Sequence, residues 1–140
     1  MPIWLRIVAG VLAGLVAGSL VNMGLVALGP SIVPPPPGAD MTTAEGLKAA
    51  MPLMGPQHFL MPFLAHALGT LAGAWVAGLV ARPRPTVAVA AIGLLFMAGG
   101  IAASFMIPAP AWFIATDLLL AYLPMAGLAL YLLRRHDAAA

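Results

Sequence analysis

An apolar stretch from His58 to Ala81 constrains the fold more than any other part of the chain. A helix needs about 20 apolar residues to cross a bilayer, and this stretch supplies them while carrying a histidine well inside the run. On an α-helix its small and polar residues share one face, and larger apolar residues cover the rest. That face consists of His66, Gly69, Thr70, Gly73 and Ala77. The sequence therefore predicts a spanning helix with another helix packed closely against its small face.

The composition agrees with a membrane protein. Hydrophobic residues make up 63% of the 140 residues and charged residues only 7%, against about 25% charged residues in a soluble domain. So few charges cannot form a water-soluble surface, and we expect lipid to solvate most of the chain. The absence of cysteine excludes disulfides, thiolate nucleophiles and cysteine metal sites. The basic residues form no stripe interleaved with aromatic residues, so we expect no nucleic-acid partner.

Four apolar runs predict an all-α polytopic membrane protein, a four-transmembrane-helix bundle that forms a single membrane domain over residues 1–140. The first run is longer than the roughly 7–15 residues of a signal-peptide core and lacks a clear A-x-A site, so we expect an uncleaved span. We expect Gly29 and Pro30 to end this span and Pro124 to kink the fourth. The predicted spans cover about residues 3–28, 58–81, 86–107 and 111–133.

Glycines recur at intervals of four residues in the first predicted span. Gly10, Gly14 and Gly18 form two overlapping GxxxG units, and Gly69 and Gly73 repeat this spacing in the second span. Such rows let two helix backbones approach closely, so that dispersion forces can hold helices together in lipid. We expect the first row to make this contact either inside the bundle or across a homo-oligomer interface.

The segment 29–57 is expected to connect the first two spans outside the membrane. Its prolines 34–37 predict a stiff polyproline II rod of roughly 12 Å. A capping box from Thr42 to Glu45 predicts the start of a short amphipathic helix that faces outward. Its apolar stripe consists of Leu47, Ala50, Met51 and Met54. We expect this helix to lie at the membrane surface or to cap the bundle.

The basic residues predict the orientation of the chain. With four crossings, all five arginines fall on one side of the membrane and the single lysine, Lys48, falls on the other. Cytoplasmic segments are enriched in basic residues. We therefore expect both the N- and C-termini to be cytoplasmic and the proline-rich loop to face outward. The arginines are Arg6, Arg82, Arg84, Arg134 and Arg135.

Each predicted span places a polar side chain in the outer third of the membrane. These residues are Asn22, His66, Ser104 and Asp117, by their distance from the helix ends. A carboxylate in lipid is costly and is expected to face the bundle interior, where it is paired or protonated. We therefore predict a His66–Asp117 contact, with Asn22, Thr70 and Ser104 nearby.

Two interpretations of this polar cluster stay open. Polar side chains hold membrane helices together, so the cluster could be structural; it could equally be a proton or ligand site. A metal is not expected, because His58 and His66 are eight residues apart and are the only histidines outside the C-terminal tail. The sequence contains no zinc-protease, phosphate-loop or hydrolase motif, so we expect neither a catalytic residue nor a cofactor.

Three segments carry a resemblance to known proteins: PPPPGAD, PQHFLMPFLAHALGTLAGA and APAWFIATDLLLAYLP. With them the chain resembles small, uncharacterised four-helix bacterial membrane proteins. The resemblance covers most of the chain and implies a multi-pass protein of the bacterial inner membrane. It implies no activity, substrate or catalytic residue.

The expected function is that of a non-enzymatic membrane module, either an accessory subunit or a homo-oligomer assembled through the glycine-rich helix faces. Its partners would be the lipid bilayer and either another membrane protein or a second copy of the chain. The first alternative is a small proton-linked transporter or channel that uses His66 and Asp117. The second is a membrane enzyme acting on lipid or quinone, which the lack of a nucleophile–base pair disfavours.

Overall fold

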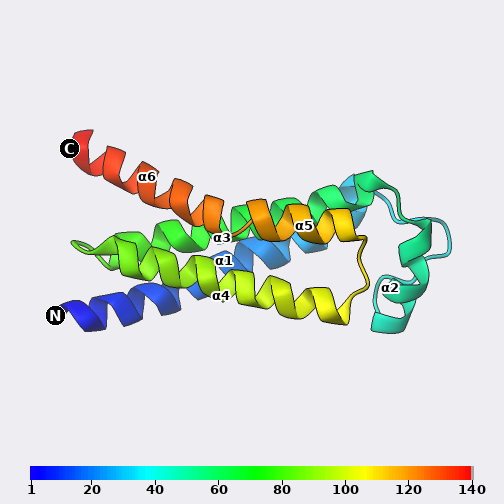
Figure 1. Cartoon of the computed structure of the whole chain (residues 1–140), viewed down its shortest axis with the longest axis horizontal. Helices are drawn as coiled ribbons and strands as arrows, with labels where there is room; N and C mark the ends of the chain where they lie inside the picture. The colour runs from blue at the N-terminus through cyan, green and yellow to red at the C-terminus, as the bar shows by residue number, and fades with distance from the viewer. Residues whose placement is uncertain (140) are drawn as a thin grey trace.

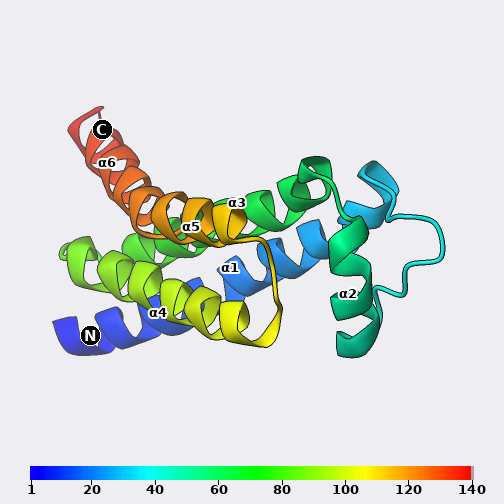
Figure 2. The same ribbon diagram turned by 45° about the vertical axis from the view of Figure 1, so that its right-hand side comes forward.

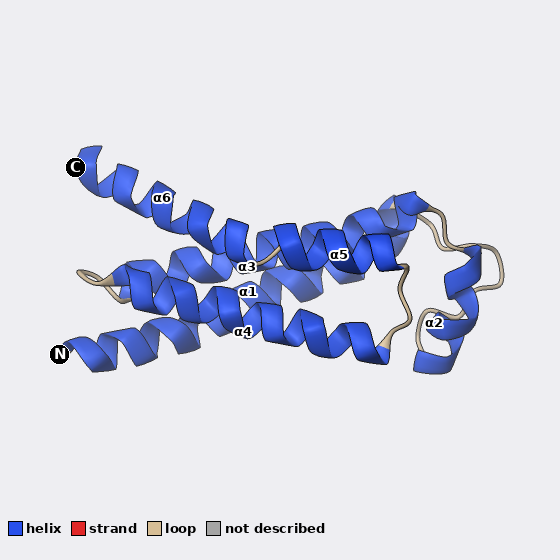
Figure 3. Ribbon diagram, in the orientation of Figure 1, coloured by secondary structure: helices blue, strands red, loops and turns tan. Residues whose placement is uncertain are grey.

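The computed structural model describes residues 1–139, and all regular secondary structure in them is helical (Figure 3). The predicted all-α fold class is confirmed. The α-helices are α1 (Ile3–Ile32), α2 (Ala44–Ala50), α3 (Leu60–Val80), α4 (Pro85–Met106), α5 (Ala111–Leu120) and α6 (Leu123–Ala139). Two short 3-10 helices, η1 (Met51–Leu53) and η2 (Pro56–Phe59), precede α3.

Four helical stretches are long and apolar enough to cross a membrane. They are α1, η2 with α3, α4, and α5 with α6. Successive stretches run in opposite directions along a common axis (Figures 1 and 2). The two chain ends and the α3–α4 turn lie at one end, called the terminal end, and α2 lies at the opposite, loop end. The chain is a multi-pass membrane protein by these four helical stretches.

The contact between α1 and α3 brings the two backbones together. A Cβ atom added at Gly10, Gly14 or Gly18 would lie 2.5–2.6 Å from a carbonyl oxygen of α3. The oxygens belong to Ala77, Gly73 and Gly69, respectively. Only glycine permits this approach, because real side-chain carbons do not come so close to backbone oxygens. The two glycine rows therefore meet within one chain, which is the first of the two contacts expected for them.

The half of the bundle nearer the terminal end is filled by small apolar side chains. Alanine dominates this group because α3, α4 and α6 approach closely there, and close helix packing leaves little room for longer side chains. We call this group the terminal-half core. Its buried members are Ala74, Ala77, Ala81, Ala88, Val89, Ile92, Ala126, Ala129 and Leu133.

The first span ends later than its sequence predicts. α1 continues to Ile32, past the predicted end near residue 28, with Pro30 inside its last turn. Proline cannot donate to the carbonyl four residues earlier, but this is a single missing bond close to a helix end. The turn still closes, because the Val33 N–H donates to the Gly29 carbonyl at 2.8 Å.

The fourth span consists of two helices rather than one kinked helix. α5 ends at Leu120 and α6 begins at Leu123, because Pro124 has no N–H for the Leu120 carbonyl and its ring crowds that carbonyl. α6 then diverges from the bundle toward the C-terminus (Figure 1). It runs past the predicted end at residue 133, and the Arg82 Nη2 atom lies 2.7 Å from Asp137 Oδ1 beside its last turns.

The predicted short helix is present, but its cap lies one residue later than predicted. Thr43, not Thr42, is the N-cap, and its Oγ1 accepts a hydrogen bond from the Gly46 N–H at 3.0 Å. Thr42 instead donates its N–H and hydroxyl to Asp40 Oδ1, at 2.8 and 2.6 Å. The hydroxyl bond from Thr42 holds the pKa of Asp40 below its ordinary value. The predicted capping box from Thr42 to Glu45 is therefore absent, and the cap is formed by Thr43 alone.

Candidate functional site

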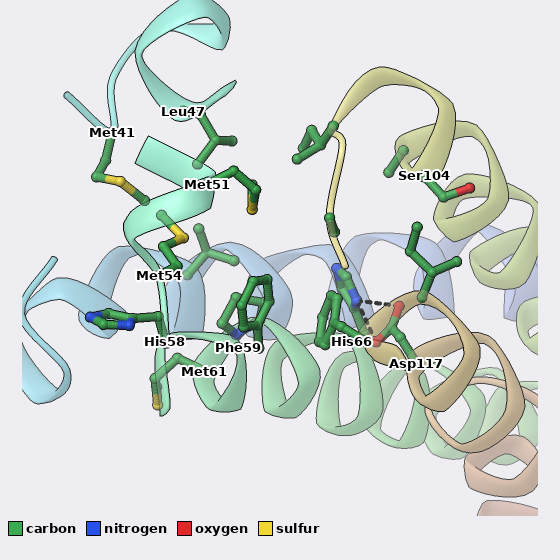
Figure 4. A pocket seen from close by; sticks show the side chains of 18 of the residues that line it. Met41, Leu47, Met51, Met54, His58, Phe59, Met61, His66, Ser104 and Asp117 are labelled. Carbon is green, nitrogen blue, oxygen red and sulfur yellow. Dashed lines mark hydrogen bonds and ion pairs between the residues drawn. The ribbon is translucent and has the colours of Figure 1, made fainter. Parts of the chain in front are cut away.

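A cavity of about 380 Å³ lies at the loop end of the bundle (Figure 4). The ends of α1, α3, α4 and α5 form its walls, and the segment around α2 covers it. Its volume lies within the range of small-molecule sites, about 300–1,000 Å³. The covering segment contributes Met41, Leu47, Met51 and Met54. Most of the predicted apolar stripe thus faces the cavity, and of the two predicted positions the short helix takes the one that caps the bundle.

His66 and Asp117 form the polar floor of this cavity. His66 Nδ1 lies 2.9 Å from both carboxylate oxygens of Asp117, so its N–H is donated to the carboxylate (Figure 4). The side chain of His66 is 27% exposed and that of Asp117 only 7%. One residue comes from α3 and the other from α5, and both line the cavity. The carboxylate is thus paired inside the bundle, which lowers the cost of placing it among apolar helices.

Tyr122 completes the hydrogen bonding of the carboxylate. Its hydroxyl donates to Asp117 Oδ2 at 2.9 Å, and its ring stacks on that of His66 with centroids 5.8 Å apart. Tyr122 is only 2% exposed. The sequence analysis missed it, because residues five apart on a regular helix point about 140° away from each other. The break between α5 and α6 brings the two side chains together, and Pro124 was the signal for that break.

Thr70 contacts the backbone of His66 and not the polar side chains of the site. It is fully buried, and its hydroxyl donates to the His66 carbonyl at 2.7 Å, one turn earlier on α3. This bond stays within one helix and does not reach Asp117.

Ser104 and Asn22 lie in different surroundings. Ser104 lines the cavity, but its hydroxyl donates to the Ile101 carbonyl at 2.7 Å. Asn22 is half-buried and packs over Gly69, where an added Cβ would lie 3.1 Å from Asn22 Cβ. Among residues 1–139 its side chain has no hydrogen-bond partner, and it is not part of the cavity lining. The structure thus brings His66 and Asp117 together, leaves Ser104 on the cavity wall and keeps Asn22 apart.

His58 belongs to the loop structure rather than to the floor. Its Nδ1 accepts from the Gly55 N–H at 2.9 Å, and its Nε2 donates to the Pro34 carbonyl at 3.2 Å. This imidazole therefore ties the proline-rich segment to η2 and uses both of its nitrogens. Within residues 1–139, no group of three His, Cys, Asp or Glu side chains is arranged to hold a metal ion.

The remaining nitrogen of His66 is an unpaired polar atom at the floor of the cavity. Figure 4 shows it directed away from Asp117 and toward the cavity. No atom in the described part of the chain forms a hydrogen bond with this Nε2 atom. An imidazole that donates from Nδ1 can accept at Nε2 when neutral and donate there when protonated. The floor can therefore bind a polar group of either kind.

Comparison with protein-family models, curated proteins and solved structures finds no match for this chain. The resemblance to small bacterial membrane proteins therefore rests on the sequence segments alone. The four long apolar stretches make the chain a multi-pass membrane protein.

Proposed function

We propose that this protein binds a small, mostly apolar molecule in the cavity at the loop end, with His66 holding the polar part of the ligand. The observation that carries the proposal is an apolar cavity with one unused hydrogen-bonding atom at its floor. Binding sites for small molecules combine these two features: apolar walls provide affinity and a few polar groups set orientation. The protein is then a non-enzymatic membrane module, alone or as an accessory subunit of a larger assembly.

The other expected functions have less support. A channel or transporter that uses His66 and Asp117 needs a polar route to the terminal end. In the described residues, the space beneath the site is filled by the terminal-half core, whose members carry no polar side chain. A membrane enzyme needs an activated nucleophile or a general base next to a reacting bond. The histidine–carboxylate pair has a tyrosine hydroxyl beside it, but that hydroxyl is donated to Asp117.

We also propose that both termini are cytoplasmic, so that the cavity faces the outside of the bacterial inner membrane. The support is the charge asymmetry: all five arginines belong to the segments of the terminal end, and Lys48 to the loop end. A reporter active only in the cytoplasm should be active when fused after Leu133 and silent when inserted near Ala39. Activity at the second position would reverse the orientation.

The binding proposal is tested with two neighbouring alanines of α4. Ala103 lines the cavity, whereas Ala102 is exposed on the outer surface of the helix. A phenylalanine at position 103 occupies cavity volume, but at position 102 it projects into lipid. We expect Ala103→Phe to lose small molecules that the wild type and Ala102→Phe retain during purification in mild detergent, as measured by native mass spectrometry. Equal retention by both variants would contradict the proposal, as would a wild type that neither retains nor is stabilised by any neutral amphiphile.

A further inference from the structure

We propose that the ligand of this cavity is an uncharged amphiphile of the quinone and quinol class, whose ring oxygen bonds His66 Nε2. The inference rests on the proposed binding function and adds the chemistry of the ligand. It starts from the charges that face the cavity. Of all the lining residues, only His58, His66 and Asp117 are titratable, and no lysine, arginine or glutamate is among them.

An acidic ligand fits this charge distribution poorly. The Asp117 carboxylate already lies 2.9 Å from the His66 ring, and it is the natural counterion of a protonated imidazole. A second carboxylate at Nε2 would leave one net negative charge in an apolar cavity with no arginine or lysine to balance it. Burying an uncompensated charge costs several kcal/mol, so fatty acids and similar anions are disfavoured.

A cationic ligand is disfavoured for a related reason. The Asp117 carboxylate is the only acidic side chain in the lining, and it already accepts hydrogen bonds from His66 and Tyr122. Its side chain is only 7% exposed, so a cation in the cavity would have little access to this carboxylate. The charge distribution therefore selects an electrically neutral ligand.

The free nitrogen of His66 suits two forms of one ligand. A carbonyl oxygen accepts from Nε2–H when the imidazole is protonated, and a hydroxyl donates to Nε2 when it is neutral. A quinone carries the carbonyl and its quinol the hydroxyl at the same ring position. Asp117 holds the Nδ1 proton in both cases, so the ring keeps its orientation.

The walls suit a flat ring with an apolar tail. Phe59 and Phe113 line the cavity with ring centroids 4.8 Å apart, and Phe113 lies one turn before Asp117 on α5. Aromatic walls favour stacking or edge contacts with a planar ligand. The flexible methionine side chains of the lining adapt to an irregular chain. These methionines are Met41, Met51, Met54 and Met61.

The experiment compares three probes on the full chain in lipid nanodiscs. They are a dimethoxy-methyl-benzoquinone with one isoprene unit, decanoate and decylammonium, with binding to empty nanodiscs subtracted. We expect the quinone to bind the wild type at least about tenfold more tightly than either charged probe, since each 1.4 kcal/mol is a factor of ten. This ranking is measured on the wild type and does not depend on whether a variant folds. Equal or tighter binding of a charged probe would overturn the inference.

Two variants then isolate the imidazole. The first variant is Asp117→Asn, and the second combines Asp117→Asn with His66→Phe. Neither contains a buried carboxylate at position 117, and the two proteins differ only in the ring at position 66. We expect the quinone to bind the second about tenfold more weakly than the first, the worth of one hydrogen bond at the upper end of its range. Equal affinity would refute the role of Nε2.

Ala103→Phe separates the two proposals. If it abolishes quinone binding while the His66 substitution has no effect, the cavity binds ligands but the assigned chemistry is wrong. If Ala103→Phe changes the binding of no probe relative to Ala102→Phe, the binding function itself fails.

Discussion

The two halves of the bundle are built from the same helices but are packed differently. Near the terminal end, glycine and alanine rows bring α1, α3, α4 and α6 together around an apolar core. Near the loop end, the helices enclose a cavity of about 380 Å³ with a histidine and a carboxylate at its floor. The comparison teaches that small residues stabilise one half while the other half keeps the space and polar groups that binding requires.

Two contacts between a basic side chain and an aspartate, one in each half, sharpen this contrast. Arg82 Nη2 and Asp137 Oδ1 are 2.7 Å apart at the terminal end, with side chains 34% and 49% exposed. This contact does not have the geometry of a hydrogen bond, and within residues 1–139 the buried Nη2 and Nε atoms of Arg82 both lack a hydrogen-bond partner. The His66–Asp117 pair has a similar separation, but its carboxylate is almost fully buried. Similar distances therefore carry different energies, because water screens the half-exposed Asp137 carboxylate but not the enclosed Asp117 carboxylate.

The largest effect is expected at the close contact of α1 with α3. Gly14→Leu should destabilise the protein by roughly 3 kcal/mol or prevent folding, because the new Cβ would lie 2.5 Å from the Gly73 carbonyl oxygen. Gly24→Leu on the same helix is the control, since nothing lies within 4 Å of its added Cβ. The free energy of unfolding in a detergent titration measures both. Similar losses for the two variants would show that helix propensity, not backbone contact, sets the effect.

The second effect concerns the buried pair. His66→Leu should destabilise the protein by roughly 3 kcal/mol, because it leaves the Asp117 carboxylate without its main partner among apolar helices. Asp117→Leu should cost less, since a lone imidazole can stay neutral. The double variant should be more stable than the sum of the single losses predicts. Strictly additive losses in the same titration would mean that the two side chains are not coupled.

A smaller effect is expected at the helix break. Tyr122→Phe keeps the ring stacked on His66 but removes the hydroxyl that donates to Asp117. A hydrogen bond to a charged group contributes about 1.5–3 kcal/mol, and His66 remains as the other donor. We therefore expect a loss near 1.5 kcal/mol, at the lower end of that range. Tyr131→Phe is the control, because Tyr131 is exposed on α6; an equal loss there would argue against a specific bond.

The smallest effect belongs to the exposed pair. Arg82→Gln should change the free energy of unfolding by about 0.5 kcal/mol or less, because exposed ion pairs contribute little. The change should shrink further in high salt, which screens exposed charges. A loss as large as that of His66→Leu would remove the contrast between the two halves.

Much of the helical architecture could be predicted from the sequence. Runs of apolar residues longer than a bilayer requires have few alternatives in lipid, because every backbone polar group must bond within its own segment. The helix ends were less predictable. Pro30 is expected to stop α1 but lies in its last turn, and the N-cap of α2 is Thr43 rather than Thr42. Such ends depend on a few hydrogen bonds whose partners the local pattern does not reveal.

The candidate site, like the fold, could be predicted from the sequence only in part. The sequence by itself determined the similar depth of His66 and Asp117, since depth follows from the rise per residue, and the cost of a carboxylate in lipid required that it be paired. Only the tertiary structure decided which side chains meet. The break at Pro124 turns Tyr122 toward Asp117, α2 covers the cavity, and Asn22 packs over Gly69 instead of joining the polar floor. These contacts depend on how each helix is rotated about its axis, and that rotation is set by side-chain packing among all four spans.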